Sequence, residues 1–179
     1  WVTQSLLPEP DLFGFGVATL EEGAQLRAAV GPQPRIIVFS GATPWSPEKA
    51  NYCKARKLDV VLTEFEDWKV FHRFRHYREL EYQLEFNSGM NRLGMSPNHV
   101  QSIRESLSKL SASDQPRGVF SHLAQGETPA SSLSRQQLES FKGLQAVLSP
   151  VLGKTDFHLA NSAAIWNARE FELHRYTQC

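Results

Sequence analysis

Short apolar runs alternate along the chain with longer segments in which apolar residues recur every three or four positions. The short runs are rich in β-branched and aromatic residues, which is typical of buried strands. The predicted strands are residues 14–19, 35–41, 58–64, 81–88, 117–124 and 156–162. The helical spacing predicts helices over 20–30, 46–57, 67–77, 97–110 and 134–148, with a short helical turn over 163–167. Residues 1–12 are mixed, with Pro8 and Pro10 interrupting any helix before them.

Two of the predicted helices carry start signals. Ser46 followed by Pro47 is typical of a helix that begins with proline at its first position. The run from Ser134 to Gln137 resembles a capping box at the head of the long helix that follows it.

Six alternations of strand and helix predict parallel strands with helices outside them, in either a barrel or an open sheet. The spacing of about 30 residues per unit is near that of a (β/α)8 TIM-type barrel. We therefore predict an α/β fold, a (β/α)8 barrel that is incomplete and has about six β/α units, with residues 1–179 as one domain. An eight-unit barrel needs one more unit at each end. The abrupt ends at Trp1 and Cys179 lead us to expect a fragment of a longer protein.

The composition suits one globular domain, with 41% apolar and 21% charged residues. Lysine and arginine number 19, as do aspartate and glutamate, so net charge gives no case for nucleic acid or an anionic membrane. No apolar run approaches the ~20 residues that cross a bilayer. Cys53 and Cys179 are too far apart for a metal-binding pattern, and a reducing cytoplasm is the default compartment.

The stretch from Phe86 to Met95 is the first candidate for chemistry. It follows a predicted strand, and it places Arg92 between Gly89 and Gly94. An arginine at the carboxyl end of a strand is well placed to meet an anion or an electron-rich oxygen. The alternative is an ordinary connection from strand to helix with an exposed arginine.

Strand periodicity adds further candidates. In the fourth strand Gln83, Glu85 and Asn87 share one face, and we expect this polar face to look into the barrel. In the fifth strand Phe120 and His122 share a face, and in the sixth His158, Ala160 and Ser162 do.

The candidate side chains Glu85, His122, His158 and Ser162 thus come from the carboxyl halves of three strands, with Arg92 just beyond one of them. In barrels of this kind that end carries the chemistry. A single buried histidine is usually structural, but this set predicts a site. The spacing is not that of a metal site, and Arg92 favours an anionic ligand instead.

Four motifs carry a family resemblance. They are Gly16–Glu22 (GVATLEE), Ser88–Gly94 (SGMNRLG), Val119–Ala124 (VFSHLA) and His158–Ala164 (HLANSAA). In order and spacing they resemble bacterial alanine racemases over nearly the whole chain. The second and fourth motifs together are specific, whereas the first alone is weak.

The resemblance implies a barrel that carries pyridoxal 5'-phosphate (PLP), followed by a β-rich domain, in a homodimer whose active sites use both subunits. Arg92 would hydrogen-bond the phenolic oxygen of the cofactor, and His122 would lie against its pyridine ring. His158 would support an arginine that contacts the ring nitrogen. Ser162 would bind the phosphate, with Asn161 beside it.

One departure from the family concerns Glu85, which stands where many relatives have a carbamylated lysine. That group presents a carboxylate-like anion that orients the motif arginine. We therefore expect Glu85 to orient Arg92 directly, or through a water because glutamate is shorter. The alternative is that Glu85 is merely solvated at the barrel mouth.

The resemblance also implies catalytic bases that this chain does not carry. The lysine that holds PLP is expected upstream of Trp1, and the tyrosine base in the second domain. None of the lysines stands at the family's lysine motif; they are Lys49, Lys54, Lys57, Lys69, Lys109, Lys142 and Lys154. We therefore expect residues 1–179 alone to be inactive, and no catalytic residue is assigned within them.

The full-length protein is expected to interconvert L- and D-alanine for peptidoglycan precursors in the cytoplasm. Its substrate would be a small molecule, and neither nucleic acid nor a membrane is an expected partner. Two alternatives are a non-catalytic PLP-binding barrel and a racemase of broader substrate range. A purely structural role is a more distant one.

Overall fold

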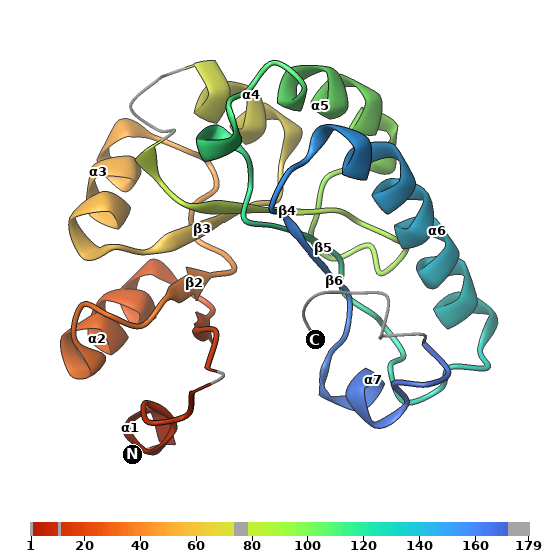
Figure 1. Ribbon diagram of the computed structural model, residues 1–179, viewed down its shortest axis with the longest axis horizontal. Helices are drawn as coiled ribbons and strands as arrows, with labels where there is room; N and C mark the ends of the chain where they lie inside the picture. The colour runs from red at the N-terminus through yellow and green to blue at the C-terminus, as the bar shows by residue number, and fades with distance from the viewer. Residues whose placement is uncertain (1, 11, 74–78, 172–179) are drawn as a thin grey trace. The chain divides into compact units, whose positions relative to one another are not determined.

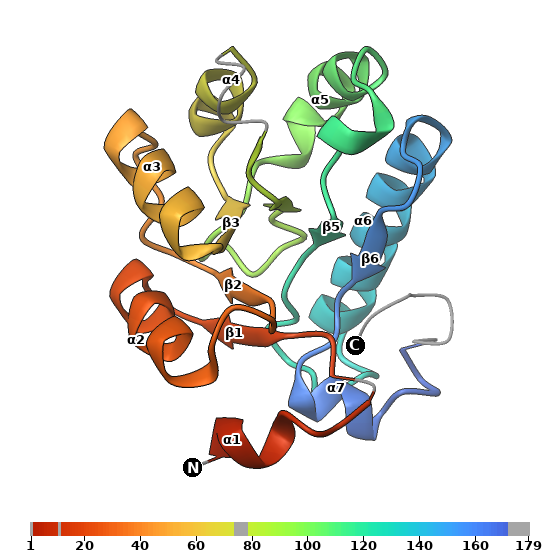
Figure 2. The same ribbon diagram turned by 60° about the vertical axis from the view of Figure 1, so that its left-hand side comes forward.

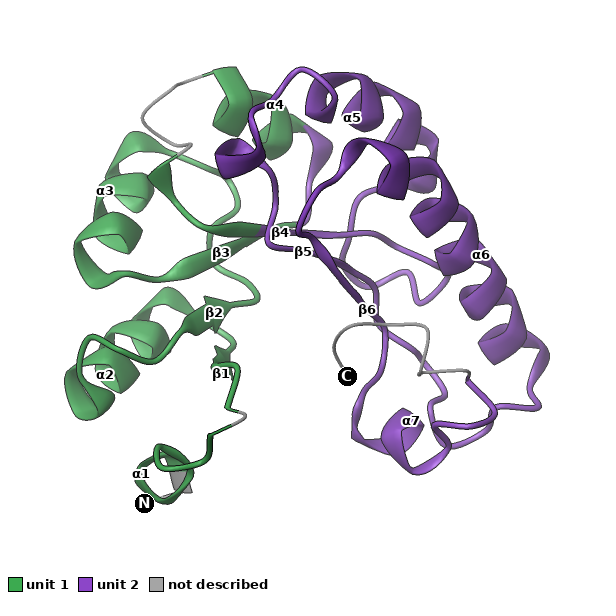
Figure 3. Ribbon diagram, in the orientation of Figure 1, with its two compact units in different colours: residues 1–62, 66–82 green, residues 63–65, 83–179 purple. Residues whose placement is uncertain are grey.

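The computed structural model describes residues 2–10, 12–73 and 79–171, and its helices and strands alternate along the chain (Figures 1 and 2). The chain divides into two compact units, shown in Figure 3. The first comprises residues 1–62 and 66–82, and the second comprises residues 63–65 and 83–179.

The first unit is built on three parallel strands in chain order. They are β1 (Phe15–Val17), β2 (Ile36–Val38) and β3 (Asp59–Leu62). The register places Phe15 opposite Ile36 and Ile37 opposite Asp59. The connecting helices are α2 (Leu20–Val30) and α3 (Pro47–Arg56), preceded by α1 (Val2–Leu6) and followed by α4 (Phe65–Arg73). Every residue of β2 and β3 is buried, as expected of parallel strands covered by helices.

Helix starts in this unit follow local rules that the sequence makes visible. The Thr19 hydroxyl accepts from the Glu22 amide at 3.2 Å, and the Glu22 carboxylate accepts from the Thr19 amide at 3.2 Å. This capping box begins α2 and confirms the helix predicted over 20–30. Ser46 caps α3, with Pro47 as its first residue, as predicted.

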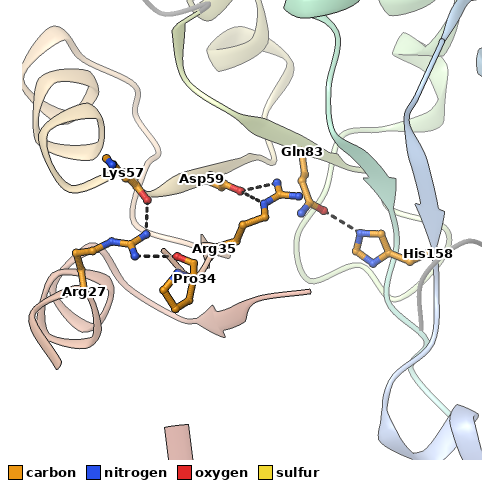
Figure 4. A network of polar contacts seen from close by, with 7 residues as sticks. All are labelled: Arg27, Pro34, Arg35, Lys57, Asp59, Gln83 and His158. Carbon is orange, nitrogen blue, oxygen red and sulfur yellow. Dashed lines mark hydrogen bonds and ion pairs between the residues drawn. The ribbon is translucent and has the colours of Figure 1, made fainter. Parts of the chain in front are cut away.

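Two arginines fasten the elements of the first unit together (Figure 4). The Arg27 guanidinium on α2 donates to the carbonyl oxygens of Pro34 and Lys57, each at 2.7 Å. Arg35, just before β2, donates through Nε to Asp59 Oδ2 at 2.9 Å. The strand starts are thus held by charge-assisted bonds.

The second unit repeats the same arrangement. Its strands are β4 (Tyr82–Glu85), β5 (Gly118–Phe120) and β6 (Asp156–His158), parallel and in chain order. Its α-helices are α5 (Val100–Leu107), α6 (Ser132–Leu148) and α7 (Ser162–Trp166). Short 3-10 turns η2 (Pro97–His99), η3 (Ala112–Asp114) and η4 (Ser149–Val151) lie between them.

Helices α5 and α6 of the second unit lie side by side (Figures 1 and 2). The buried apolar face of α6 is formed by Leu138, Phe141, Leu144 and Leu148, at the helical spacing of three and four residues. This face packs into the core of the unit together with Leu84 and Val119, which are fully buried on β4 and β5.

The sequence predictions of the elements are confirmed in type and order, but every observed strand is shorter than predicted. Residues 74–77 of the helix predicted over 67–77 lie outside the described residues, and the helix begins earlier, at Phe65. The short helix α1 was not predicted.

The capping box predicted at Ser134 is wrong. Ser131 is the N-cap, and its hydroxyl accepts from the Ser134 amide at 3.0 Å. The Ser134 hydroxyl instead donates to the Gln125 carbonyl at 2.9 Å.

In the described part of the chain, no helix is both long and apolar enough to cross a membrane.

Candidate functional site

The second unit aligns three side chains in one row across its strands. Glu85, Phe120 and His158 are register partners on β4, β5 and β6. The rings of Phe120 and His158 stack, with centroids 4.7 Å apart and planes 13° from parallel. Because register partners in a parallel sheet point to the same face, these three side chains share one surface of the unit.

A polar pair lies beside this row. His158 Nε2 donates to Gln83 Oε1 at 2.8 Å, as Figure 4 shows. Gln83 is 1% exposed, and burial lowers the pKa of His158 to about 4, so its imidazole is neutral near pH 7. Gly118 makes the pair possible, because a Cβ there would lie 2.7 Å from Gln83 Oε1 and 3.3 Å from His158 Nε2.

Glu85 is buried, with 5% of the residue exposed. Burial raises its pKa to about 7, and the positive charge of Arg92 acts in the opposite direction. Near pH 7 a nearby cation readily changes the protonation state of a buried carboxyl with this pKa. Among the described ion pairs, none joins Glu85 to Arg92.

Residues 87–95, here called the arginine loop, follow β4 directly. The Met95 amide donates to the Glu85 carbonyl at 2.8 Å, and the Asn87 amide donates to the Met95 carbonyl at 3.0 Å, so the loop closes on itself. The Asn87 Oδ1 atom accepts from the amides of Gly89 at 2.9 Å and Asn91 at 3.1 Å. These bonds form a compact turn that presents Arg92 with an exposed side chain.

Glycine is required at the end of this loop. Gly94 has a φ of +104°, and a Cβ there would lie 2.7 Å from the Asn87 nitrogen and from the Phe86 carbonyl carbon. Asn91 also has a positive φ, of 57°, which asparagine tolerates better than most residues. The backbone therefore fixes where the arginine is presented.

His122 lies in the segment 121–126, here called the histidine loop, which follows β5. Burial lowers the pKa of His122, and the Arg92 charge lowers it further. Because the Arg92 charge lowers the pKa of His122, the guanidinium lies close enough to act electrostatically on the imidazole. A neutral imidazole beside a cation suits an aromatic, electron-rich ligand better than a second cation.

Asn161 and Ser162 stand at the start of α7. Asn161 caps the helix by accepting from the Ala164 amide at 3.0 Å, and it donates to the Leu123 carbonyl at 3.1 Å. Ser162 is the first helical residue and is exposed. At Gly126 a Cβ would lie 2.3 Å from Asn161 Oδ1, so the histidine loop passes directly over the cap.

Strand periodicity thus located some predicted residues and not others. Gln83, Phe120 and His158 lie on the shared face, as predicted. The predicted strands extended too far, because β5 ends at Phe120 and β6 at His158, so His122 and Ser162 lie beyond the observed strands. Loop and helix geometry positions those two side chains instead.

Sequence reasoning missed three buried polar residues, Ser88, Ser121 and Gln137. Gln137 is fully buried on α6 and Ser88 is 5% exposed. The signal for Gln137 was available, because it lies four residues before Phe141 and so falls on the apolar stripe of its helix. Among the described residues, no group of three or more His, Cys, Asp or Glu is arranged to hold a metal ion.

Residues 6–177 match the family model for the N-terminal domain of alanine racemase. A catabolic alanine racemase from Mesorhizobium japonicum is 34% identical over 85% of this chain and 38% of its own length. An alanine racemase from Rickettsia akari is 30% identical over 96% of this chain and 46% of its own. The chain therefore spans less than half the length of these relatives.

Solved structures give the same result. The biosynthetic alanine racemase from Pseudomonas aeruginosa superposes with a TM-score of 0.73 at 30% identity, over 92% of this chain and 43% of its own. The enzyme from Bartonella henselae, solved with covalently bound pyridoxal phosphate, gives 0.72 at 20% identity, over 88% and 44%. This likeness confirms the predicted fold class, a barrel of the TIM type represented by six β/α units.

Proposed function

Because the chain belongs to the family of the alanine racemase N-terminal domain, we propose that the full-length protein is a PLP-dependent alanine racemase that interconverts L- and D-alanine. The observation that carries this proposal is the arrangement at the carboxyl ends of β4, β5 and β6. There, a buried carboxyl, two neutral imidazoles and an arginine loop come from one unit.

The residues present fit PLP, which has a phosphate ester, an aromatic ring and a phenolic oxygen. A glycine-bounded loop presents the Arg92 cation for the phenolic oxygen. The neutral His122 imidazole suits the face of a pyridine ring, because it adds no second charge there. The exposed Ser162 hydroxyl next to the Asn161 cap suits the phosphate. When bound, PLP supplies an electron sink for the carbanion formed at the α-carbon.

The His158 imidazole has a different part. It would orient the arginine that contacts the ring nitrogen, while its Nε2 proton is held by Gln83. Its lowered pKa keeps it neutral, so it does not repel a guanidinium. The stacked Phe120 ring limits access of water to one side of the imidazole.

We propose that Glu85 replaces the carbamylated lysine of many relatives and orients Arg92. Burial leaves this carboxyl with a pKa of about 7. A guanidinium close to it favours the ionised carboxylate, and the two opposite charges then attract each other. A water can bridge the two groups where the shorter glutamate side chain does not reach. Loss of cofactor affinity in Glu85→Gln is the expected result, and unchanged affinity and activity would contradict this role.

The biological role we propose is to supply D-alanine for peptidoglycan precursors, by a homodimer acting in the cytoplasm. The similarity to a catabolic alanine racemase supports an alternative role in alanine breakdown. Deletion of the gene separates the two. A requirement for added D-alanine during growth supports the first, whereas failure to grow on alanine alone supports the second.

An assay of the purified full-length protein tests the proposal. We expect PLP-dependent racemisation of alanine and slower turnover of lysine, arginine and serine. Comparable rates on all four would indicate a racemase of broad range, and bound PLP without turnover would indicate a non-catalytic carrier. Residues 1–179 alone are expected to be inactive, because no lysine in them stands at the family's lysine motif. Racemisation by that polypeptide would contradict this expectation.

A further inference from the structure

The amide of Gln137 connects the two loops on which the candidate site depends. Its Nε2 atom donates to the His122 carbonyl at 2.9 Å and to the Ser88 hydroxyl at 3.2 Å. Its Oε1 atom accepts from the Ala124 amide at 2.9 Å. One side chain on α6 thus holds the histidine loop at two points and the arginine loop at one.

The orientation of this amide is determined by its partners. If the oxygen and nitrogen were exchanged, an oxygen would face the His122 carbonyl and an NH2 group would face the Ala124 N–H. Neither contact is a hydrogen bond, so only the observed orientation satisfies the group. Because the side chain is fully buried, no water replaces a lost partner.

The serine pair extends the connection. The Ser121 hydroxyl donates to the Ser88 hydroxyl at 2.7 Å and accepts from the Ser88 amide at 3.3 Å. Both serines are buried, at 4% and 5% exposed. Ser88 and Ser121, near the start of the two loops, are therefore joined to each other, and Ser88 is also joined to Gln137.

Backbone geometry shows that the arginine loop lies against this side chain. Gly89 has a φ of +137°, and a Cβ there would lie 3.3 Å from Gln137 Cγ. The loop crosses Gln137 at a point where only glycine adopts the backbone conformation without strain. Its path toward Arg92 is thus set by contact with α6.

We propose that Gln137 is a positioning residue that fixes the spacing between Arg92 and His122, and through it the affinity for PLP. This inference rests on the proposed function. Because Gln137 is fully buried, it would act through the Ser88 hydroxyl and the His122 and Ala124 backbone rather than by direct contact with a ligand. It is distinct from Asn161, which holds the histidine loop at another point, the Leu123 carbonyl.

The test compares Gln137→Met, which keeps the side-chain length without its polar atoms, with Gln136→Met at the exposed neighbouring position. Amide hydrogen exchange in the PLP-free full-length protein is the first readout. Each neutral hydrogen bond lost should raise local opening about fivefold. We therefore expect at least tenfold faster exchange over 87–95 and 121–126 in Gln137→Met, with no change in β1 to β3.

The second readout is PLP itself. We expect Gln137→Met to weaken PLP binding about tenfold and to shift the absorbance maximum of the cofactor at saturation, which global destabilisation alone would not do. Ser88→Ala, a milder change, should speed exchange in the arginine loop and leave 122–124 protected. It also keeps the inference testable if Gln137→Met does not fold.

Unchanged exchange in both loops together with unchanged PLP affinity would overturn the inference. So would exchange that rises equally throughout the protein, because Gln137 would then only stabilise the fold. If the wild-type protein fails to bind PLP, the proposed function fails. The exchange pattern then still decides whether Gln137 connects the loops.

Discussion

Gln83 and His158, which lie 75 positions apart in the chain, are joined by a hydrogen bond of 2.8 Å between Oε1 and Nε2. The strand between them contributes Gly118 at this point, so no side chain separates them. The pair holds a neutral, half-buried imidazole next to the stacked Phe120 ring. Residues from β4, β5 and β6 thus together position the His158 imidazole.

Replacing Gly118 by alanine should break this pair. The new Cβ would lie 2.7 Å from Gln83 Oε1, and overpacking of this kind costs about 1–3 kcal/mol. Urea denaturation measures the loss. The matched control is Gly143→Ala on α6, where nothing lies within 4 Å; it should stabilise by roughly 0.5–1 kcal/mol. Equal effects of the two variants would contradict the account.

Ionisation of Glu85 should change the free energy of unfolding with pH. Its folded pKa of about 7 lies above the ordinary value of 4.5, so its contribution is present below pH 4.5 and lost as the pH rises through 7. Glu85→Gln removes that loss. Relative to wild type, the variant should gain about 3 kcal/mol between pH 4.5 and 7. Denaturation at several pH values measures it, with the exposed Glu127→Gln as control; a constant difference would contradict the prediction.

His158 should titrate in the opposite sense. Its folded pKa of about 4 lies below the ordinary value of 6.5, so the stability that depends on the neutral ring is lost as the pH falls from 6.5 toward 4. An NMR titration of the imidazole protons should show no midpoint until about pH 4. A midpoint near 6.5 would mean that the ring is solvated and that its bond to Gln83 is not formed in solution.

Gly94→Ala should displace the arginine loop. The Cβ would lie 2.7 Å from the Asn87 nitrogen, at a positive φ, and the loop has to open to accept it. We expect a loss of about 1–3 kcal/mol in stability and weaker PLP binding. Gly31→Ala is the control, because Gly31 also has a positive φ but has nothing within 4 Å. That variant should be destabilised without any change in PLP affinity.

The sequence predicted the elements well because their signals are local. The β-branched run before Ser40 and the Ser46–Pro47 start of α3 each act within a few residues. The strands were predicted too long, because the alternating sequence pattern continues past Phe120 and His158, where the observed strands end.

The candidate site was predictable only in part. The strand-borne Gln83 and His158 follow from periodicity, whereas His122 and Ser162 are positioned by loops that periodicity does not describe. The role of Gln137 depends on contacts with residues 88, 122 and 124, which are distant in sequence. No local pattern specifies such contacts, although a glutamine on an apolar helical stripe signals that a partner exists.

The proposed function requires the arginine loop to present Arg92 to a bound PLP molecule. The most direct test is the PLP-dependent rate of alanine racemisation by the full-length protein, by Arg92→Ala, and by Arg135→Ala, an exposed arginine on α6. We predict activity in the wild type and in Arg135→Ala. In Arg92→Ala we predict a rate lower by about 100-fold or more, which is the scale for losing one positioned charge partner. Equal rates in all three proteins, or no racemisation by the wild type, would contradict the claim.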